Sequence, residues 1–166
     1  MKLHPSAFVA PGASVMGDVT IAEDASVWYQ CVLRGDIGPI TIGPRSNIQD
    51  LTMVHVDEDV PCTIGADVGV GHGCILHGCT IEDGSLIGMG AILLNNVRVG
   101  TGSVIGAGAV VTEGMVIPPG SLVLGVPAKI VRPVDETLRE RIRLTAEHYV
   151  ELARRHRQGE FPLHHP

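Results

Sequence analysis

The chain has 166 residues, of which 45% are hydrophobic and only 3% aromatic, and its formal net charge is −6. This length supports one main domain, and the scarcity of large rings favours thin, regular layers over a conventional core. Acidic and basic residues are mixed and form no basic stripe, which argues against a nucleic-acid partner. Because no apolar run approaches the roughly 20 residues that span a bilayer, and residues 1–5 lack a signal-peptide core, we expect no membrane association and a cytoplasmic location.

Along residues 1–133 an aliphatic residue recurs at every sixth position, in runs separated by short slips. We call these residues the anchors. They are Val9, Val15, Ile21, Val27, Leu33, Ile42, Ile48, Val54, Ile64, Val70, Leu76, Ile81, Ile87, Leu93, Val99, Ile105, Val111, Ile117 and Val123. A period of six fits a short strand plus a tight turn, three of which close one triangular coil. The anchor and a small residue four positions later would fill the interior, so the pattern predicts a solenoid of stacked parallel coils.

Glycine often follows the anchor directly, as at Gly43 and Gly88. We interpret these glycines as residues that tolerate the sharp corner between strands. The period changes over residues 134–158, where apolar residues such as Ile142 fall on one helical face, which predicts an amphipathic C-terminal helix packed on the solenoid. Residues 159–166 are predicted to form a flexible tail with solvated histidines.

The four cysteines have neither the density of a disulfide scaffold nor the paired spacing of a structural zinc site, so we interpret them as free thiols. Cys31 and Cys74 fall on interior positions of the repeat, where a small apolar side chain is needed. Cys79 lies near His77 in the sequence and is a candidate for an additional metal ligand.

Counting the anchors in threes across the slips places Arg34, His55 and His77 at equivalent positions, each directly after an anchor of the same face. These side chains should form an outward ladder on consecutive coils, about 4.8 Å apart. His55 and His77 can therefore share one metal ion.

His72 lies two residues beyond its anchor on another face, where it stacks next to Asp50. A ligand from a different corner reaches the pair naturally when two subunits meet, and threefold symmetry closes such a contact into a ring. We therefore predict a homotrimer with three sites, each built from His55 and His77 of one subunit and His72 of the next. Three imidazoles with an open fourth position are typical of catalytic zinc, and iron(II) or cobalt(II) would use the same ligands.

The ordered motifs around these histidines resemble the gamma-class carbonic anhydrase family. They are Arg34-Gly35-Asp36, Asn47-Ile48-Gln49-Asp50, His55, Gly71-His72, Leu76-His77-Gly78-Cys79 and Ile87-Gly88-Met89-Gly90-Ala91. The similarity extends from about residue 7 to residue 149, although single hexapeptides are shared with many acyltransferases. The resemblance implies an all-β, left-handed parallel β-helix of hexapeptide repeats with a C-terminal α-helix. It also implies zinc-dependent reversible hydration of carbon dioxide to bicarbonate at trimer interfaces.

The resemblance also implies roles for individual residues. His55, His72 and His77 match the zinc ligands, Gln49 matches a residue that hydrogen-bonds the zinc-bound water, and Arg34 and Asp36 match a pair at the subunit interface. This pair equally fits a role in trimer contacts alone.

Two further positions bear on proton transfer and on access to the site. The best-known members carry two acidic shuttle residues; Ile37 stands at the first position here, and only Glu58 matches the second. Glu58 also fits a solvated acidic loop. Tyr149 matches a tyrosine that leans over the site in related members, and it equally fits a core contact of the helix.

Two other functions stay open at this stage. The same fold hosts acyl-CoA thioesterases and acyltransferases, although the sequence has no extra loop with a lone catalytic histidine and no basic cluster for the coenzyme's phosphates. A non-catalytic metal-binding trimer is the second alternative. The replacement of an acidic shuttle residue by Ile37 keeps a slow or absent activity open.

Overall fold

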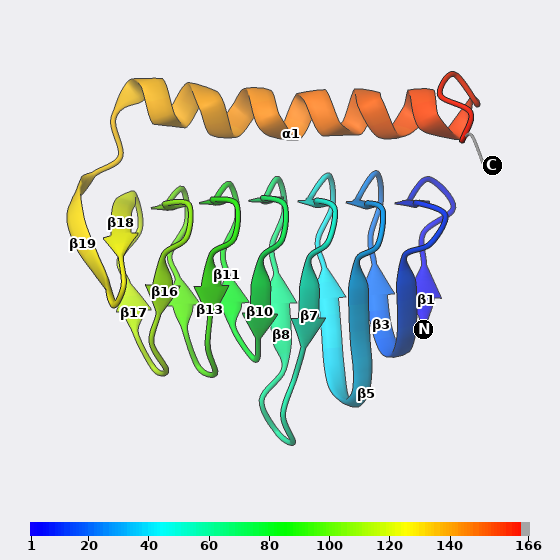
Figure 1. Cartoon of the computed structure of the whole chain (residues 1–166). Helices are drawn as coiled ribbons and strands as arrows, with labels where there is room; N and C mark the ends of the chain where they lie inside the picture. Colours follow the sequence, from blue (N-terminus) through cyan, green and yellow to red (C-terminus); the bar gives the residue numbers. More distant parts are fainter. Residues whose placement is uncertain (164–166) are drawn as a thin grey trace.

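The computed structural model describes residues 1–163, as short strands followed by one long α-helix, and the strands wind into a parallel β-solenoid (Figure 1). The last two histidines of the predicted tail lie outside the described residues. One face of the solenoid is an eight-stranded sheet. It comprises β2 (Phe8–Val9), β4 (Ser26–Val27), β6 (Asn47–Ile48), β9 (Gly69–Val70), β12 (Leu86–Ile87), β15 (Val104–Ile105), β18 (Ser121–Gly125) and β19 (Ala128–Pro133).

The other two faces form one eleven-stranded sheet that bends around a shared corner. One arm contains β7 (Met53–His55), β10 (Ile75–His77), β13 (Ile92–Leu93) and β16 (Val110–Val111). The other arm contains β1 (Lys2–Leu3), β8 (Cys62–Ile64), β11 (Thr80–Ile81), β14 (Arg98–Val99) and β17 (Val116–Ile117). The long strands β3 (Ser14–Ile21) and β5 (Val32–Ile42) pass through the corner and join the two arms.

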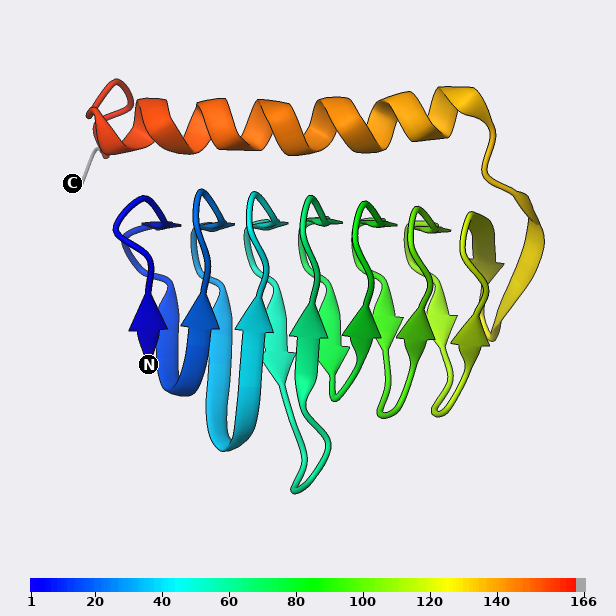
Figure 2. The same cartoon turned by 180° about the vertical axis from the view of Figure 1, so that it is seen from behind.

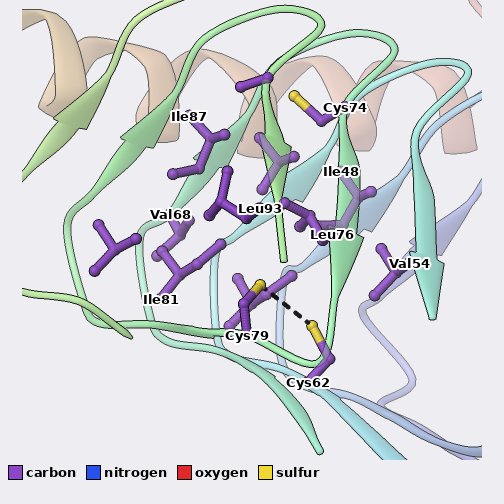
Figure 3. Packing of buried hydrophobic residues seen from close by; sticks show 14 of the residues in the cluster. Ile48, Val54, Cys62, Val68, Cys74, Leu76, Cys79, Ile81, Ile87 and Leu93 are labelled. Atoms are coloured by element: carbon purple, nitrogen blue, oxygen red, sulfur yellow. Dashed lines mark hydrogen bonds between the residues drawn. The ribbon is translucent and has the colours of Figure 1, made fainter. Parts of the chain in front are cut away.

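The anchors stack in register along the solenoid axis. Ile48, for example, pairs with Val27 on one side and Val70 on the other. Every anchor from Ile21 to Val123 is buried, and Figure 3 shows several of them meeting in the interior. The anchors of the repeat therefore form the hydrophobic core. Burying one such side chain stabilises the folded state by about 1.5–3 kcal/mol. The predicted β-helix of hexapeptide repeats is confirmed.

The glycines that follow the anchors have a different role from the predicted one. Gly43 and Gly88 do not have the positive φ of a sharp corner. A Cβ on Gly43 would lie 2.4 Å from the backbone of Gly65, and a Cβ on Gly88 would lie 2.4 Å from the backbone nitrogen of Ala107. These glycines are therefore needed because consecutive coils approach closely, and other residues adopt the left-handed turn conformation.

The α-helix, α1, covers Glu136–Arg157 and lies along the eight-stranded sheet (Figures 1 and 2). It starts later than the predicted residue 134 because Asp135 is its N-cap and accepts a hydrogen bond from the backbone of Leu138. Ile142 and Ala146 bury the apolar face that the sequence predicted. Among the described residues, no helix combines the length and apolar character that crossing a bilayer requires.

Two slips of the repeat form projections at the corner that joins the arms of the eleven-stranded sheet. One is the bend inside β5, and the other is the loop 56–61 between β7 and β8, which Figure 1 shows extending furthest from the solenoid. An isolated antiparallel bridge between Asp57 and Val60 shapes this loop. The coils beyond it return to short, regular turns, so the corner has an irregular half and a regular half.

Candidate metal centre

Arg34, His55 and His77 form the predicted ladder on the arm that leads to the irregular corner. His55 is paired with Arg34 on β5 and with His77 on β10. The two imidazole rings have their centroids 5.1 Å apart, and Nδ1 of His55 lies 3.1 Å from Nε2 of His77. Two ring nitrogens at this separation can bind one ion at the roughly 2.0–2.1 Å of a zinc–histidine bond.

In each ring, the nitrogen that points away from the other histidine, here called the outer nitrogen, contacts an oxygen that can only accept a hydrogen bond. Nε2 of His55 is 3.1 Å from Oδ1 of Asp36, and Nδ1 of His77 is 2.7 Å from Oδ1 of Asn95. A neutral imidazole has one N–H, so donation to these oxygens leaves both inner nitrogens with lone pairs that face each other. A cation shared between them would stabilise this arrangement, so the pair fits a metal ion.

Asp36 connects the histidine pair to Arg34. The Arg34 guanidinium donates a hydrogen bond to Oδ2 of Asp36, and the other carboxylate oxygen accepts from His55. These contacts hold the pKa of Asp36 below its usual range, with the Arg34 hydrogen bond as the largest cause. The same contacts favour the ionised form of Asp36, which accepts a hydrogen bond from His55. Arg34 pairs with Asp36, whereas Asp50 faces His72.

His72 lies on a different side of the solenoid, directly beyond β9. Its Nδ1 is 2.9 Å from Oδ2 of Asp50, as the register predicted, and the other oxygen of Asp50 accepts from the backbone N–H of Tyr29 at 3.3 Å. Among residues 1–163 of a single chain, no three histidine, cysteine or acidic side chains converge as a ligand set. His72 and the pair thus remain apart within one subunit.

A cavity of about 480 Å³ opens between α1 and the coils that carry His72. Gln49, His72 and Tyr149 all contribute to its lining. Nε2 of Gln49 donates to Oδ1 of Asn47 at 2.9 Å, which leaves the carbonyl oxygen of Gln49 as its other hydrogen-bonding end. The amide nitrogen of Asn47 is buried without a partner in the described part of the chain, so this polar network accommodates a further acceptor.

Tyr149 is half-buried where α1 crosses the N-terminal coils. Its ring meets the edge of Trp28 at a centroid distance of 5.3 Å, and burial, with a smaller effect of Asp50, raises the pKa of Tyr149 to about 12. The structure therefore places Tyr149 in the helix contact and also in the cavity wall, and its predicted position over the metal site stays a prediction.

The acidic loop contains Glu58, whose role in proton transfer stays a prediction. Glu58 is exposed, and none of the hydrogen bonds or ion pairs found within residues 1–163 includes it. Its neighbour Asp57 accepts a hydrogen bond from the amide nitrogen of Asn95 at 2.6 Å. Asn95 belongs to no sequence motif and was therefore not predicted, although the register of Leu93 on Leu76 places it on the coil next to His77.

All four cysteines are free and buried. Burial raises the pKa of both Cys31 and Cys74 to about 11, so neither is a reactive thiolate. The interpretation of Cys79 as an additional metal ligand is wrong, because its side chain points into the interior. Its sulfur lies 3.9 Å from that of Cys62, and Figure 3 shows the two side chains facing each other.

The fold and the paired histidines define a hexapeptide-repeat β-helix protein with a candidate metal centre on one face. Residues 78–113 match the model of the family described as bacterial transferase hexapeptide (six repeats). An X-ray structure of a Bacillus cereus protein superposes with a TM-score of 0.93 at 39% identity, covering 95% of this chain and 91% of that chain.

Curated relatives narrow the class further. A carbonic anhydrase from Geobacillus kaustophilus is 49% identical over 151 residues, which cover 90% of this chain and 82% of that protein. Gamma carbonic anhydrase 2 of Arabidopsis thaliana, a mitochondrial protein, is 44% identical over 155 residues. The match covers 90% of this chain and 56% of the plant protein, so the chain spans little more than half of that relative. The chain belongs to the gamma carbonic anhydrase family, and its cytoplasmic location stays a prediction.

Proposed function

We propose that this chain forms a homotrimer that catalyses the zinc-dependent, reversible hydration of carbon dioxide to bicarbonate. Each site would combine His55 and His77 of one subunit with His72 of the partner subunit. The observation that carries the proposal is the histidine pair, whose facing nitrogens lie 3.1 Å apart while both outer nitrogens are bonded to acceptors. Iron(II) or cobalt(II) would suit the same donors.

The separation of His72 from the pair supports a site between subunits. Carboxylates orient imidazoles at both places, Asp36 at His55 and Asp50 at His72, and such outer partners are typical of metal-ligating histidines. A second copy of the chain is the simplest way to bring the two prepared regions together, because cyclic symmetry repeats one contact around a closed ring.

His55, His72 and His77 would hold a zinc ion, which would supply the Lewis acidity that activates water towards carbon dioxide near neutral pH. The chain's own residues position the reactants. The Asn47 contact fixes the amide of Gln49, so that the Gln49 carbonyl oxygen can accept a hydrogen bond from the attacking water. Tyr149 and the apolar wall of the cavity would limit competing water around carbon dioxide, which is itself apolar.

Proton export is the step for which the chain has the fewest groups. Glu58 is exposed and free to exchange protons with buffer, and it is the acidic residue that we propose as the shuttle. At the other shuttle position Ile37 has no titratable group, so we expect proton export to limit turnover.

Acyl transfer is the main alternative. The Bacillus cereus structure carries an acetyltransferase description, and a hexapeptide transferase family protein from Anaplasma phagocytophilum superposes with a TM-score of 0.89 at 39% identity. A coenzyme A site needs cations for phosphates. In the groove beside α1, however, Arg45 pairs with Asp67 and Arg143 pairs with Glu140. These two pairs leave Arg45 and Arg143 less available for phosphates, which argues against acyl transfer in that groove. A non-catalytic metal-binding trimer is the remaining alternative.

The test is stopped-flow carbon dioxide hydration by protein reconstituted anaerobically with zinc or iron(II), beside the His72→Ala variant. Metal-dependent hydration that His72→Ala abolishes supports the proposal. Bound metal without hydration would favour the scaffold or the acyl-transfer alternative instead.

Subunit mixing tests whether the site is shared. We expect His72→Ala and His77→Ala subunits to be inactive alone, whereas a trimer containing both would have one contact with a complete ligand set. Random mixing should restore about one quarter of the wild-type sites, given threefold symmetry. Activity that stays at zero in a verified mixed trimer would contradict a site between subunits.

A further inference from the structure

We propose that Asn95 is a positioning residue for the metal, and that Asp57 fixes the orientation in which Asn95 acts. The inference rests on the proposed metal site at His55 and His77, and it assigns a role to two residues outside the ligand set. Asn95 lies in the turn after β13, and Asp57 lies in the projecting loop 56–61. Their side chains meet at the irregular corner, 2.6 Å apart.

The first step concerns which end of the Asn95 amide faces which neighbour. A carboxylate can only accept hydrogen bonds, so Asp57 requires the NH₂ end of Asn95. The carbonyl oxygen must then point the other way, towards Nδ1 of His77 at 2.7 Å. This contact removes the usual ambiguity between the oxygen and nitrogen of an asparagine side chain.

The second step concerns His77. An amide oxygen can only accept, so Nδ1 of His77 must carry the proton, and Nε2 presents its lone pair to the shared space beside His55. The wrong tautomer would place an N–H where the metal should bind. Asn95 therefore selects the metal-binding tautomer and holds the ring against rotation.

A comparison of the two ligands supports this role. His55 donates to a carboxylate, Asp36, whereas His77 donates to a neutral amide that is itself bonded to a carboxylate, Asp57. Both rings are thus linked to negative charge, one directly and one through Asn95. Two independent segments, the bend in β5 and the loop 56–61, supply these carboxylates.

The space between Asn95 and its neighbours depends on a glycine. Gly78 follows His77 directly and has a positive φ of 54°. A Cβ at this position would lie 2.4 Å from Oδ1 of Asn95 and 2.6 Å from a methyl group of Val60 in the loop. Any larger residue would push Asn95 and the loop away from the metal ligand.

The experiment measures zinc affinity by competition with a chelator in the assembled protein. Because loss of an outer partner typically costs 10–100-fold in metal affinity, Asn95→Leu should weaken binding by about that factor. Asn96→Gly is the matched control: it removes the neighbouring amide, suits the positive φ of 62° at that position, and should leave affinity unchanged.

A swap of the two side chains separates positioning from simple damage. Asn95→Asp alone brings two carboxylates together, and Asp57→Asn alone removes the group that orients the amide, so each should weaken zinc binding. The double variant Asn95→Asp/Asp57→Asn restores a donor facing an acceptor, and we expect it to recover most of the affinity. Failure of the double variant to recover, with its fold intact, would contradict the inference.

The tautomer can be read without metal by nitrogen NMR of the imidazole. We expect the Nδ1–H form of His77 in the wild type and a loss of that preference in Asn95→Leu. If both affinity and tautomer are unchanged in Asn95→Leu, the inference is wrong while the proposed function stands. If zinc binds and responds to these variants but carbon dioxide is not hydrated, the proposed function fails and the inference stands.

Discussion

The solenoid has an irregular half and a regular half. Between Leu33 and Ile81 the six-residue period slips three times, whereas from Ile81 to Val123 it is strict. Both halves have the same buried anchors and the same coil-to-coil pairing. The proposed metal ligands and the carboxylates Asp36, Asp50 and Asp57 nevertheless all lie in the irregular half, whereas Asn95, which joins Asp57 to His77, comes from the regular half. Regular stacking thus places side chains at fixed spacings, and the slips supply Asp36 and Asp57, the carboxylates that orient the histidine pair directly or through Asn95.

Equivalent positions show the same contrast. The residue after the anchor on the ladder face is Arg34, His55 or His77 in the irregular half, but Thr112 in the last coil of that face. No projecting loop covers the corner beside Thr112 (Figure 1). A histidine at such a position would have the spacing of a ligand without carboxylates to orient it.

The largest expected effect is on zinc affinity, compared at equivalent positions of the two halves. His77→Ala should lower zinc affinity by more than about 100-fold, because loss of even an outer partner costs 10–100-fold. Thr112→Ala, two coils further along the same face, is the matched control and should bind zinc normally. Metal content after dialysis against a chelator measures both. Equal metal content in the two variants would refute the assignment of His77.

The second prediction concerns stability, in which the halves should behave alike. Ile105→Ala in the regular half and Ile64→Ala in the irregular half each remove a fully buried side chain, and each should cost about 2–5 kcal/mol. Val116→Ala, at an exposed position, should change stability by less than about 0.5 kcal/mol. Denaturant unfolding at one fixed subunit concentration provides the comparison, since association contributes to stability. A much smaller loss at Ile64 would mean that the slips loosen the core.

The third prediction tests whether the bend in β5 lacks a proton-transfer group. Ile37 is about half exposed in this bend, so a carboxylate is tolerated there. Ile37→Glu should raise kcat about tenfold and leave kcat/KM unchanged, because a positioned acid or base accelerates proton transfer only. Ile37→Gln is the uncharged control. An unchanged kcat at low buffer concentration would show that proton export is not limiting.

The smallest expected effect is on the pH dependence of stability, through Tyr149 on α1. Burial raises the pKa of Tyr149 to about 12, so the folded protein holds this proton more tightly than the unfolded chain does. The stability that neutral Tyr149 contributes is therefore present below about pH 10 and is lost as the pH rises towards 12. A tyrosinate absorbance titration should show a late step that Tyr149→Phe removes. If Tyr149→Phe leaves the titration unchanged, the residue is not buried in the assembled protein.

The sequence by itself determined the solenoid and the faces of the ladder residues. The physical reason is that every coil contains the same strand and turn. Once Ile48 is paired with Val27 on the neighbouring coil, His55 must also be paired with Arg34. His72 could be assigned to a different side by the same counting. Interior side chains are specified locally, by a period that needs no knowledge of distant contacts.

Only the tertiary structure decided what lies between the coils at the corner. The hydrogen bond that Asn95 donates to Asp57 joins residues 38 positions apart. Asp57 lies in a loop whose path the six-residue period does not predict. The inward direction of Cys79, and the close approach that requires Gly43, likewise depend on the neighbouring coil. Periodicity specifies which residues stack, whereas the orientation of a polar side chain at a corner is set by the particular acceptor that the next coil brings within reach.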